Sequence, residues 1–216
     1  SFPQELNKPF QGMETNGNPW NLSRVDRATW SEGLDVPTMA ANPKADVLFW
    51  VGCAASYDDR AKKIARATVA LLKQAGIDFA ILGQEESCTG DSARRAGNEL
   101  LFLMLTETNV ATINGYREQG GAKKIITTCP HCFNALANEY PDFGAKWEVV
   151  HHADYLLELV ALDDEGQRIG LDPDGDEEKE YEKKVMTIAH QELWIGCTAC
   201  SKICPKKCYT HAAASI

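Results

Sequence analysis

The sequence lacks several features that would place it in a common functional class. It has no apolar run near the roughly 18 residues of a membrane-spanning helix, and no secretory signal peptide opens it. Basic residues are outnumbered, with 22 Lys and Arg against 31 Asp and Glu, whereas a nucleic-acid binder usually carries a basic patch. No nucleotide-binding fingerprint is present, because Gly115 to Gly121 has neither the required pattern nor position. We therefore expect no transmembrane segment in this chain and no nucleic-acid partner.

The composition is that of an ordinary globular protein with many cysteines. Its 216 residues, 44% hydrophobic and 25% charged, fit one or two domains with a substantial core. The chain begins at Ser1 without a methionine, so we expect a processed or partial chain. Four disulfides would be typical of a shorter secreted protein. The length and two close Cys-x-x-Cys pairs favour metal or redox sites in a reducing cytoplasm instead. The cysteines are Cys53, Cys88, Cys129, Cys132, Cys197, Cys200, Cys204 and Cys208.

The order of apolar runs and helical patterns predicts an α/β fold on a parallel sheet. Strands are predicted over 46–52, 77–82, 123–128 and 147–151. Helices are predicted over about 59–75, over 92–106 with a second to about 119, over 132–140 and over 153–161. This alternation is typical of parallel strands joined by helical crossovers.

We expect four regions along the chain. They are an irregular N-terminal wrap over 1–44, an iron–sulfur α/β domain over 45–162, an acidic linker over 163–183 and a C-terminal four-cysteine segment over 184–216, which opens with a strand over 184–188. The wrap is expected to hold a short helix over 24–32 and to be anchored on the core by Phe10, Trp20 and Trp30. The linker is read as a solvated charge run, with a docking surface for a redox partner as the alternative.

The first four cysteines follow predicted strands. Cys53 comes after the 46–52 strand, Cys88 after the next, and Cys129 and Cys132 after the third. The carboxyl ends of parallel strands line one crevice, so we expect these thiols to meet at one metal centre. Thiolates suit zinc and iron–sulfur clusters, and cubane clusters commonly take four. Zinc sites of four cysteines usually draw on two short knuckles, so ligands dispersed over three strand ends favour a 4Fe-4S cluster, with zinc as the alternative.

Charge near this site is expected to be balanced by helix ends. Asp91 is predicted to cap a helix just after Cys88, and another helix begins at Cys129 and Cys132. Backbone N–H groups at those ends stabilise thiolates. Arg94 and Arg95 either add to this effect or are surface residues of the first helical turn.

A different reading of the third cysteine motif is a thiol–disulfide oxidoreductase. Cys129-Pro130-His131-Cys132 follows a strand and precedes a helix, as in some thioredoxin-fold enzymes. The helix N-terminus would lower the pKa of Cys129 and make it a nucleophile. This reading leaves Cys53 and Cys88 unexplained.

The last four cysteines predict a second site. The run Cys197-x2-Cys200-x3-Cys204-Pro205-x2-Cys208 is similar to a bacterial ferredoxin motif, although its spacing differs. Four thiols this close together indicate a metal site, with a cluster favoured over zinc. Lys202, Lys206 and Lys207 would partly balance the cluster charge. Together the two groups predict two 4Fe-4S clusters.

The motifs around the first site resemble a known family. They are Val51-Gly52-Cys53-Ala54-Ala55, Glu86-Ser87-Cys88-Thr89-Gly90-Asp91, Ala93-Arg94-Arg95, Cys129-Pro130-His131-Cys132, His151-His152-Ala153 and Gly17-Asn18-Pro19-Trp20. Over residues 2–160 the chain resembles the first cysteine-rich (CCG) domain of D-type heterodisulfide reductase subunits and related iron–sulfur oxidoreductases. The resemblance implies an iron–sulfur electron-transfer subunit, or a fragment of one.

The resemblance also implies partners and one departure. The partners would be other redox subunits: a flavoprotein, a ferredoxin-like protein or a membrane quinone-reactive subunit. The location would be cytoplasmic, peripheral to the membrane through such partners. The family pattern has a Cys-Cys-Gly triplet, and in heterodisulfide reductase five cysteines hold a noncubane cluster that handles a disulfide. Here Thr89 follows Cys88, so four thiolates remain, which favours electron relay over catalysis and assigns no catalytic residue.

Overall fold

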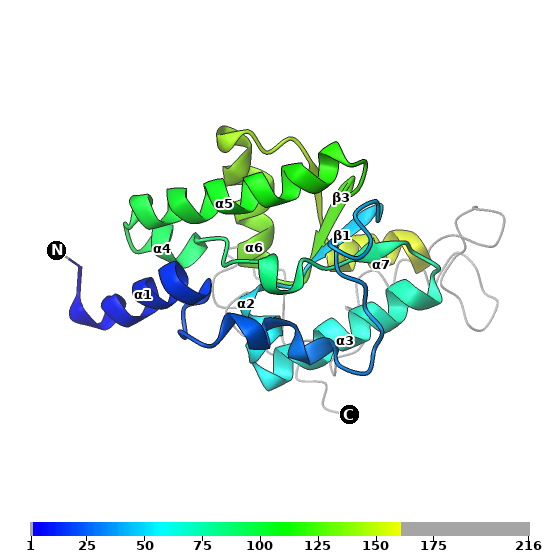
Figure 1. The fold of residues 1–216 in the computed structure, drawn as a ribbon, viewed down its shortest axis with the longest axis horizontal. Coiled ribbons are helices and arrows are strands. Elements are labelled where there is room, and N and C mark those ends of the chain that lie inside the picture. The colour runs from blue at the N-terminus through cyan, green and yellow to red at the C-terminus, as the bar shows by residue number, and fades with distance from the viewer. Residues whose placement is uncertain (1, 161–216) are drawn as a thin grey trace, which may run out of the picture. The chain divides into compact units, whose positions relative to one another are not determined.

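A four-stranded parallel sheet lies between the helices of the described part of the chain (Figure 1). In the computed structural model, residues 2–160 are the part of the chain that the structure describes. The strands are β1 (Val47–Trp50), β2 (Phe79–Ala80), β3 (Lys124–Thr127) and β4 (Glu148–His151), and each neighbouring pair is parallel. This confirms the predicted α/β fold with a parallel sheet.

Helices join the strands and form the outer layers. The α-helices are α1 (Asn7–Asn16), α2 (Gly52–Tyr57), α3 (Asp59–Gln74), α4 (Asp91–Arg95), α5 (Glu99–Glu118), α6 (Pro130–Asn134) and α7 (His152–Val160). The short helices are η1 (Gln4–Leu6), η2 (Arg24–Ser31), η3 (Gly83–Glu85), η5 (Tyr140–Phe143) and the π-helical turn η4 (Ala135–Glu139). The α3 helix begins as predicted, because the Asp58 carboxylate accepts the N–H groups of Arg60 and Ala61.

The strand order creates a topological switch point. The sheet runs β2-β1-β3-β4, so the chain leaves β1 toward β2 and then crosses to β3 on the other side of β1. In open α/β sheets, ligands bind outside the carboxyl ends of the strands where the order reverses in this way. The segments after β1 and β3 therefore flank the expected binding crevice.

Side chains alternate between two core layers, as they must along buried strands. Val47, Phe49 and Val51 belong to the layer that contains α3 residues and Trp30 of η2. Leu48 and Trp50 belong to the opposite layer, which contains α5 residues and the segment after α6. Figure 1 shows α3 and α5 on opposite sides of the sheet. Burial on both faces explains why β1 is apolar at every position.

The N-terminal segment departs from the sequence expectation in two ways. It was expected to be irregular apart from a helix over 24–32, but it also contains the ten-residue α1. Of its expected anchors, Phe10 and Trp30 are buried, whereas Trp20 is 53% exposed. Trp20 is therefore not a core anchor.

The predicted long helix over 92–106 is also interrupted. Gly97 has a φ of 84° and ends α4, after which Asn98 caps α5 by accepting the N–H of Leu101. A positive φ favours glycine, which has no Cβ to clash. The pair Gly97-Asn98 thus marks a helix boundary that the apolar periodicity alone does not show.

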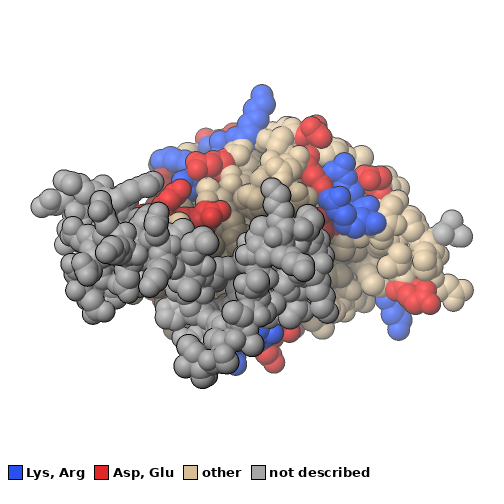
Figure 2. Space-filling model, turned by 180° about the vertical axis from the view of Figure 1, so that it is seen from behind, with Lys and Arg blue, Asp and Glu red and all other residues tan. Residues whose placement is uncertain are grey.

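On the face shown in Figure 2, basic and acidic side chains are interspersed among uncharged residues. Two lysines at the start of β3 form ion pairs with acidic residues. Lys123 Nζ lies 2.6 Å from Asp46 Oδ1, and Lys124 Nζ lies 3.0 Å from Glu148 Oε1. Within residues 2–160, no helix is both long and apolar enough to cross a membrane. The strand over 184–188, the linker over 163–183 and the C-terminal cysteines lie outside the described residues.

Candidate metal centre

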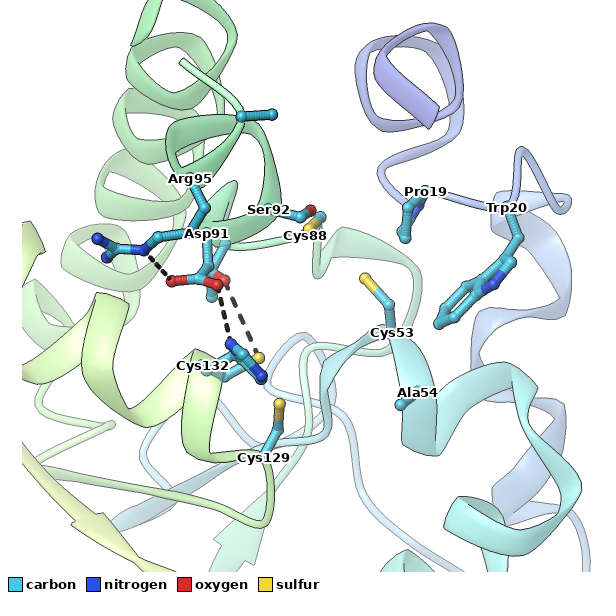
Figure 3. A pocket seen from close by; sticks show the side chains of 13 residues that line it. Pro19, Trp20, Cys53, Ala54, Cys88, Asp91, Ser92, Arg95, Cys129 and Cys132 are labelled. Atoms are coloured by element: carbon cyan, nitrogen blue, oxygen red, sulfur yellow. Dashed lines mark hydrogen bonds and ion pairs between the residues drawn. The ribbon is translucent and has the colours of Figure 1, made fainter. Parts of the chain in front are cut away.

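Four cysteines border one cavity at the carboxyl end of the sheet. Cys53, Cys88, Cys129 and Cys132 line a cavity of about 540 Å³, and in Figure 3 their sulfur atoms surround a common space. The rest of the lining comes from Pro19, Trp20, Ala54, Thr89, Asp91, Ser92, Arg95, Ala96 and His131. All four cysteines are free thiols, so the disulfide framework does not apply to them. The structure thus brings together the four residues predicted for the first site.

Each cysteine is placed by the segment that follows a strand. Cys53 lies in the first turn of α2, directly after β1, and Cys129 is the N-cap of α6, directly after β3. Cys132 lies within α6. Cys88 lies in the loop between η3 and α4. The two segments beside the switch point, the starts of α2 and α6, therefore supply three of the four sulfurs.

Gly52 allows the loops after β1 and β3 to approach each other closely. Its φ is 78°, and a Cβ added there would lie 3.2 Å from Cys132 Sγ and 3.7 Å from Cys129 Cβ. A side chain at this position would be strained by the backbone conformation and crowded by the thiols. Glycine is therefore required by both backbone and packing next to Cys53.

A buried ion pair adjoins Cys53. Arg27 Nη2 donates to Glu86 Oε1 at 2.7 Å and lies 3.6 Å from Cys53 Sγ. Both side chains of the pair are 1% exposed. Burial alone would lower the pKa of Arg27, but the negative charges of Glu86 and the Cys53 thiolate outweigh it and raise the pKa. Arg27 therefore carries a fixed positive charge beside the sulfur.

Glu86 binds the start of the helix that carries Cys53. Its Oε2 accepts the N–H of Val51 and its Oε1 accepts the N–H of Gly52, both at 2.8 Å. N–H groups at a helix start have no partner within the helix. The Glu86 carboxylate satisfies two of them and fixes the direction in which Cys53 leaves β1.

Backbone and hydroxyl groups surround the remaining buried sulfurs. The N–H of Gly90 lies 3.4 Å from Cys88 Sγ, and Thr89 Oγ1 lies 4.0 Å from Cys132 Sγ. Thr89 is 2% exposed and lines the cavity. The threonine that replaces the family's second cysteine thus occupies a position from which a side-chain sulfur would reach the same cavity.

The charged residues at the rim pair with one another. Asp91 accepts from Arg95 Nε at 3.2 Å, as Figure 3 shows. Its Oδ2 also lies 3.0 Å from His131 Nδ1. Arg94 lies 3.0 Å from Glu139, which also pairs with Arg95. The prediction that Asp91 caps its helix is wrong, because α4 has no side-chain cap. Both arginines bind carboxylates, so their charges are largely compensated within this network.

The thiols form two pairs with opposed pKa shifts. Hydrogen bonding from Cys88 is the main cause that lowers the pKa of Cys53, with burial opposing it, and the same contact raises the pKa of Cys88. The pKa of Cys129 is lowered to about 6, first by the Cys132 thiol and then by backbone N–H groups of α6, while that of Cys132 is raised. The predicted effect of the helix start on Cys129 is present.

We expect the lowered pKa of Cys129 to be visible in metal-free protein. Iodoacetamide should modify Cys129 first, with a rate that levels off above pH 7 and is about tenfold lower at pH 5, because only the thiolate reacts. An ordinary thiol would still accelerate through pH 8.5. Residue-resolved mass spectrometry measures both rates. A Cys129 rate that keeps rising between pH 8 and 9 would contradict the assignment.

The arrangement of the four thiols can be compared with what a zinc ion and an iron–sulfur cluster each require. Within residues 2–160, no three His, Cys, Asp or Glu side chains are grouped tightly enough to hold a single metal ion. A zinc ion needs four sulfurs at about 2.3 Å from one point, whereas in a cubane each thiolate binds a different iron atom. Four sulfurs around one cavity can each bind a different iron atom, as a cluster requires.

The α/β fold with cysteines at its strand ends defines a class of cysteine-rich domain, and comparison with known proteins shows which family this part of the chain resembles. Residues 47–137 match the family profile of the CCG cysteine-rich domain. This match confirms the resemblance seen in the motifs. No solved structure matches the chain significantly.

The chain is similar to several proteins whose names describe redox functions. The chain is 43% identical over 165 residues to an EtfAB:quinone oxidoreductase of Syntrophomonas wolfei, covering 74% of this chain and 22% of that protein. It is 32% identical over 149 residues to the D-type subunit of a dihydromethanophenazine:CoB--CoM heterodisulfide reductase of Methanosarcina barkeri, covering 68% and 35%. It is 50% identical over 56 residues to Ferredoxin-3 of a Nostoc species, covering 26% and 54%. The chain thus spans less than a quarter of the first of these relatives.

Sequence reasoning missed Arg27 and gave Glu86 no role. Arg27 lies in a segment read as a wrap, and its partner is far away in the sequence. A lone arginine in a short helix carries no local sign of burial. His151 and His152, quoted for the resemblance, pack edge to face with ring centroids 4.4 Å apart and are not among the residues that line the cavity.

Proposed function

We propose that this protein transfers electrons through an iron–sulfur cluster held by Cys53, Cys88, Cys129 and Cys132. The observation that carries the proposal is the meeting of four free thiols, from three loops, around one cavity. When bound, such a cluster supplies one-electron chemistry, and the protein sets its potential through hydrogen bonds to sulfur, burial and charge. The residues described above provide all three.

The rest of the proposal follows the sequence and the relatives. A 4Fe-4S cluster at the first site matches four ligands, and a second cluster would be held by the four closely spaced thiols of Cys197, Cys200, Cys204 and Cys208. Similarity to a ferredoxin supports iron–sulfur binding. The protein would work with other redox subunits, such as a flavoprotein or a quinone-reactive subunit, as the relatives' names suggest. We also propose a cytoplasmic location, peripheral to the membrane where partner subunits bind it. The proposed domain limits are 45–162 for the iron–sulfur domain, 163–183 for the acidic linker and 184–216 for the C-terminal segment.

Metal analysis tests the proposal directly. Anaerobically prepared protein should contain iron and acid-labile sulfide in equal amounts, about four of each per occupied site. It should show a broad visible absorbance that bleaches on reduction. Colourless protein with stoichiometric zinc would make this a structural module instead. The zinc measurement on the same sample provides the control for metal selectivity.

Because Thr89 stands where the family has a second cysteine, we expect the first site to relay electrons and not to cleave disulfides. With four thiolates a cubane is fully ligated, and residues 2–160 contain no fifth cysteine to hold an additional iron unit. A catalytic metal site, in contrast, keeps an open position. We expect chemically reduced protein to show no sustained turnover of small heterodisulfides. Repeated cleavage of heterodisulfides by a variant that lacks the four C-terminal cysteines, Cys197, Cys200, Cys204 and Cys208, would contradict the inference from Thr89.

A thiol–disulfide oxidoreductase is the second candidate, favoured by the lowered pKa of Cys129 beside a raised pKa of Cys132. A nucleophile next to a buried resolving thiol has this arrangement. Metal-free protein should then turn over disulfides rapidly, and Cys129→Ser should abolish the reaction. Absence of turnover by metal-free protein, alongside bound iron in anaerobic samples, would remove this candidate.

A further inference from the structure

The ion pair of Arg27 and Glu86 is connected to more of the metal site than Cys53. Arg27 Nη1 donates to the Gly17 carbonyl at 3.1 Å, and the N–H of Cys88 donates to that same carbonyl at 2.7 Å. Arg27 therefore contacts Glu86, the sulfur of Cys53 and the carbonyl that holds the backbone of Cys88. One side chain from η2 links the loops after β1 and β2 at the cavity.

The positive charge of Arg27 is balanced by Glu86, without any contribution from the cysteines. Arg27 and Glu86 are both 1% exposed and 2.7 Å apart, so their fields largely cancel at a distance. The carboxylate oxygens face Arg27 and the N–H groups of Val51 and Gly52. The guanidinium, in contrast, directs a donor toward Cys53 Sγ. The sulfur thus receives a specific charge-assisted N–H group from a pair with no net charge.

We infer that Arg27 is a positioning residue that fixes Cys53 and Cys88 as ligands and raises the reduction potential of the group bound there. The inference rests on the proposed iron–sulfur function. Reduction adds negative charge to a cluster, and a donor to a ligand sulfur stabilises that charge more than it stabilises the oxidised state. Removing the donor should therefore make the potential more negative.

Removing the arginine alone would leave Glu86 as a buried unpaired carboxylate, which is strongly destabilising. The test variant is therefore the double substitution Arg27→Met with Glu86→Gln, which replaces a buried ion pair by neutral side chains of similar size. A redox titration followed by visible or EPR spectroscopy gives the midpoint potential. The signal of the first site is assigned by its loss in Cys132→Ala.

We expect the double variant to keep bound iron and to be reduced less easily. At the wild-type midpoint, its ratio of reduced to oxidised cluster should fall about tenfold, which is about 59 mV for one electron. Arg66→Met is the matched control, because Arg66 also anchors η2, through the Trp30 carbonyl at 2.6 Å, without contacting the cysteines. This control should leave the potential unchanged.

Arg27→Lys gives a second measurement that does not depend on the folding of the double variant. It keeps the positive charge near Glu86 but replaces a planar group with several fixed donors by one ammonium. A shift in the same direction supports the inference. An unchanged potential in the lysine variant and in any folded double variant overturns it. Wild-type protein without iron would instead contradict the proposed function, so the two failures are distinguishable.

Discussion

Replacing Cys132 with alanine is expected to remove about four iron atoms per chain and the corresponding visible absorbance. Cys132 is 7% exposed and lies at the meeting point of the loops after β1 and β3. Without its thiolate, one iron would lose its protein ligand and the cluster would be unstable in its site. Iron and sulfide analysis of anaerobic protein, together with circular dichroism to check the fold, measures the effect.

Cys204→Ala is the matched comparison, because it removes one cysteine of the C-terminal group and leaves the first group intact. It should lower the iron content by a similar amount while keeping the signal that Cys132→Ala removes. The double variant should contain almost no iron. If either single variant loses all the iron, or neither loses any, the assignment of two independent four-cysteine sites is wrong.

Gly52→Ala is expected to destabilise the fold and to impair metal binding at the same time. An alanine at a φ of 78° costs about 1–2 kcal/mol of backbone strain. Its Cβ would also lie 3.2 Å from Cys132 Sγ, which is tighter than an ordinary contact. The cysteine must move or the loop must shift, so the first site should lose most of its iron. Chemical denaturation and iron analysis measure the two effects separately.

Gly76→Ala separates backbone strain from crowding of the site. Gly76 has a φ of 66°, and a Cβ added there would meet nothing within 4 Å. This variant should lose a similar amount of stability, about 1–2 kcal/mol, but retain the iron of the wild type. Equal iron loss in both variants would show that Gly52 acts through general stability and not through its contact with Cys132.

The parallel sheet was predictable because buried strands are visible in sequence. Val47, Leu48 and Phe49 are consecutive apolar residues, as expected of a strand covered on both faces. The helix boundary at Gly97 and the exposure of Trp20 were not anticipated. The boundary is marked by the local pair Gly97-Asn98 and not by the apolar periodicity. The exposure of Trp20 depends on how neighbouring segments pack, since a tryptophan is equally compatible with a core and with the edge of a cavity.

The candidate site was predictable to the extent that topology determines it. Strand ends collect at one edge of a parallel sheet, so placing Cys53 and Cys129 after strands was sufficient to bring them together. The partners of those cysteines follow a different rule. Arg27 and Glu86 meet through folding of the N-terminal segment, and a contact between distant residues has no local pattern in the sequence.

The carbonyl of Gly17, shared by Arg27 and the backbone of Cys88, determines how short a working version of this protein can be. The family profile begins at residue 47, but a polypeptide trimmed to that limit would lack both Gly17 and the guanidinium that neutralises Glu86. Its cysteines would all be present, yet a buried carboxylate would be left unpaired beside them. A shortened chain for expression or for transfer into another protein should therefore begin ahead of Gly17.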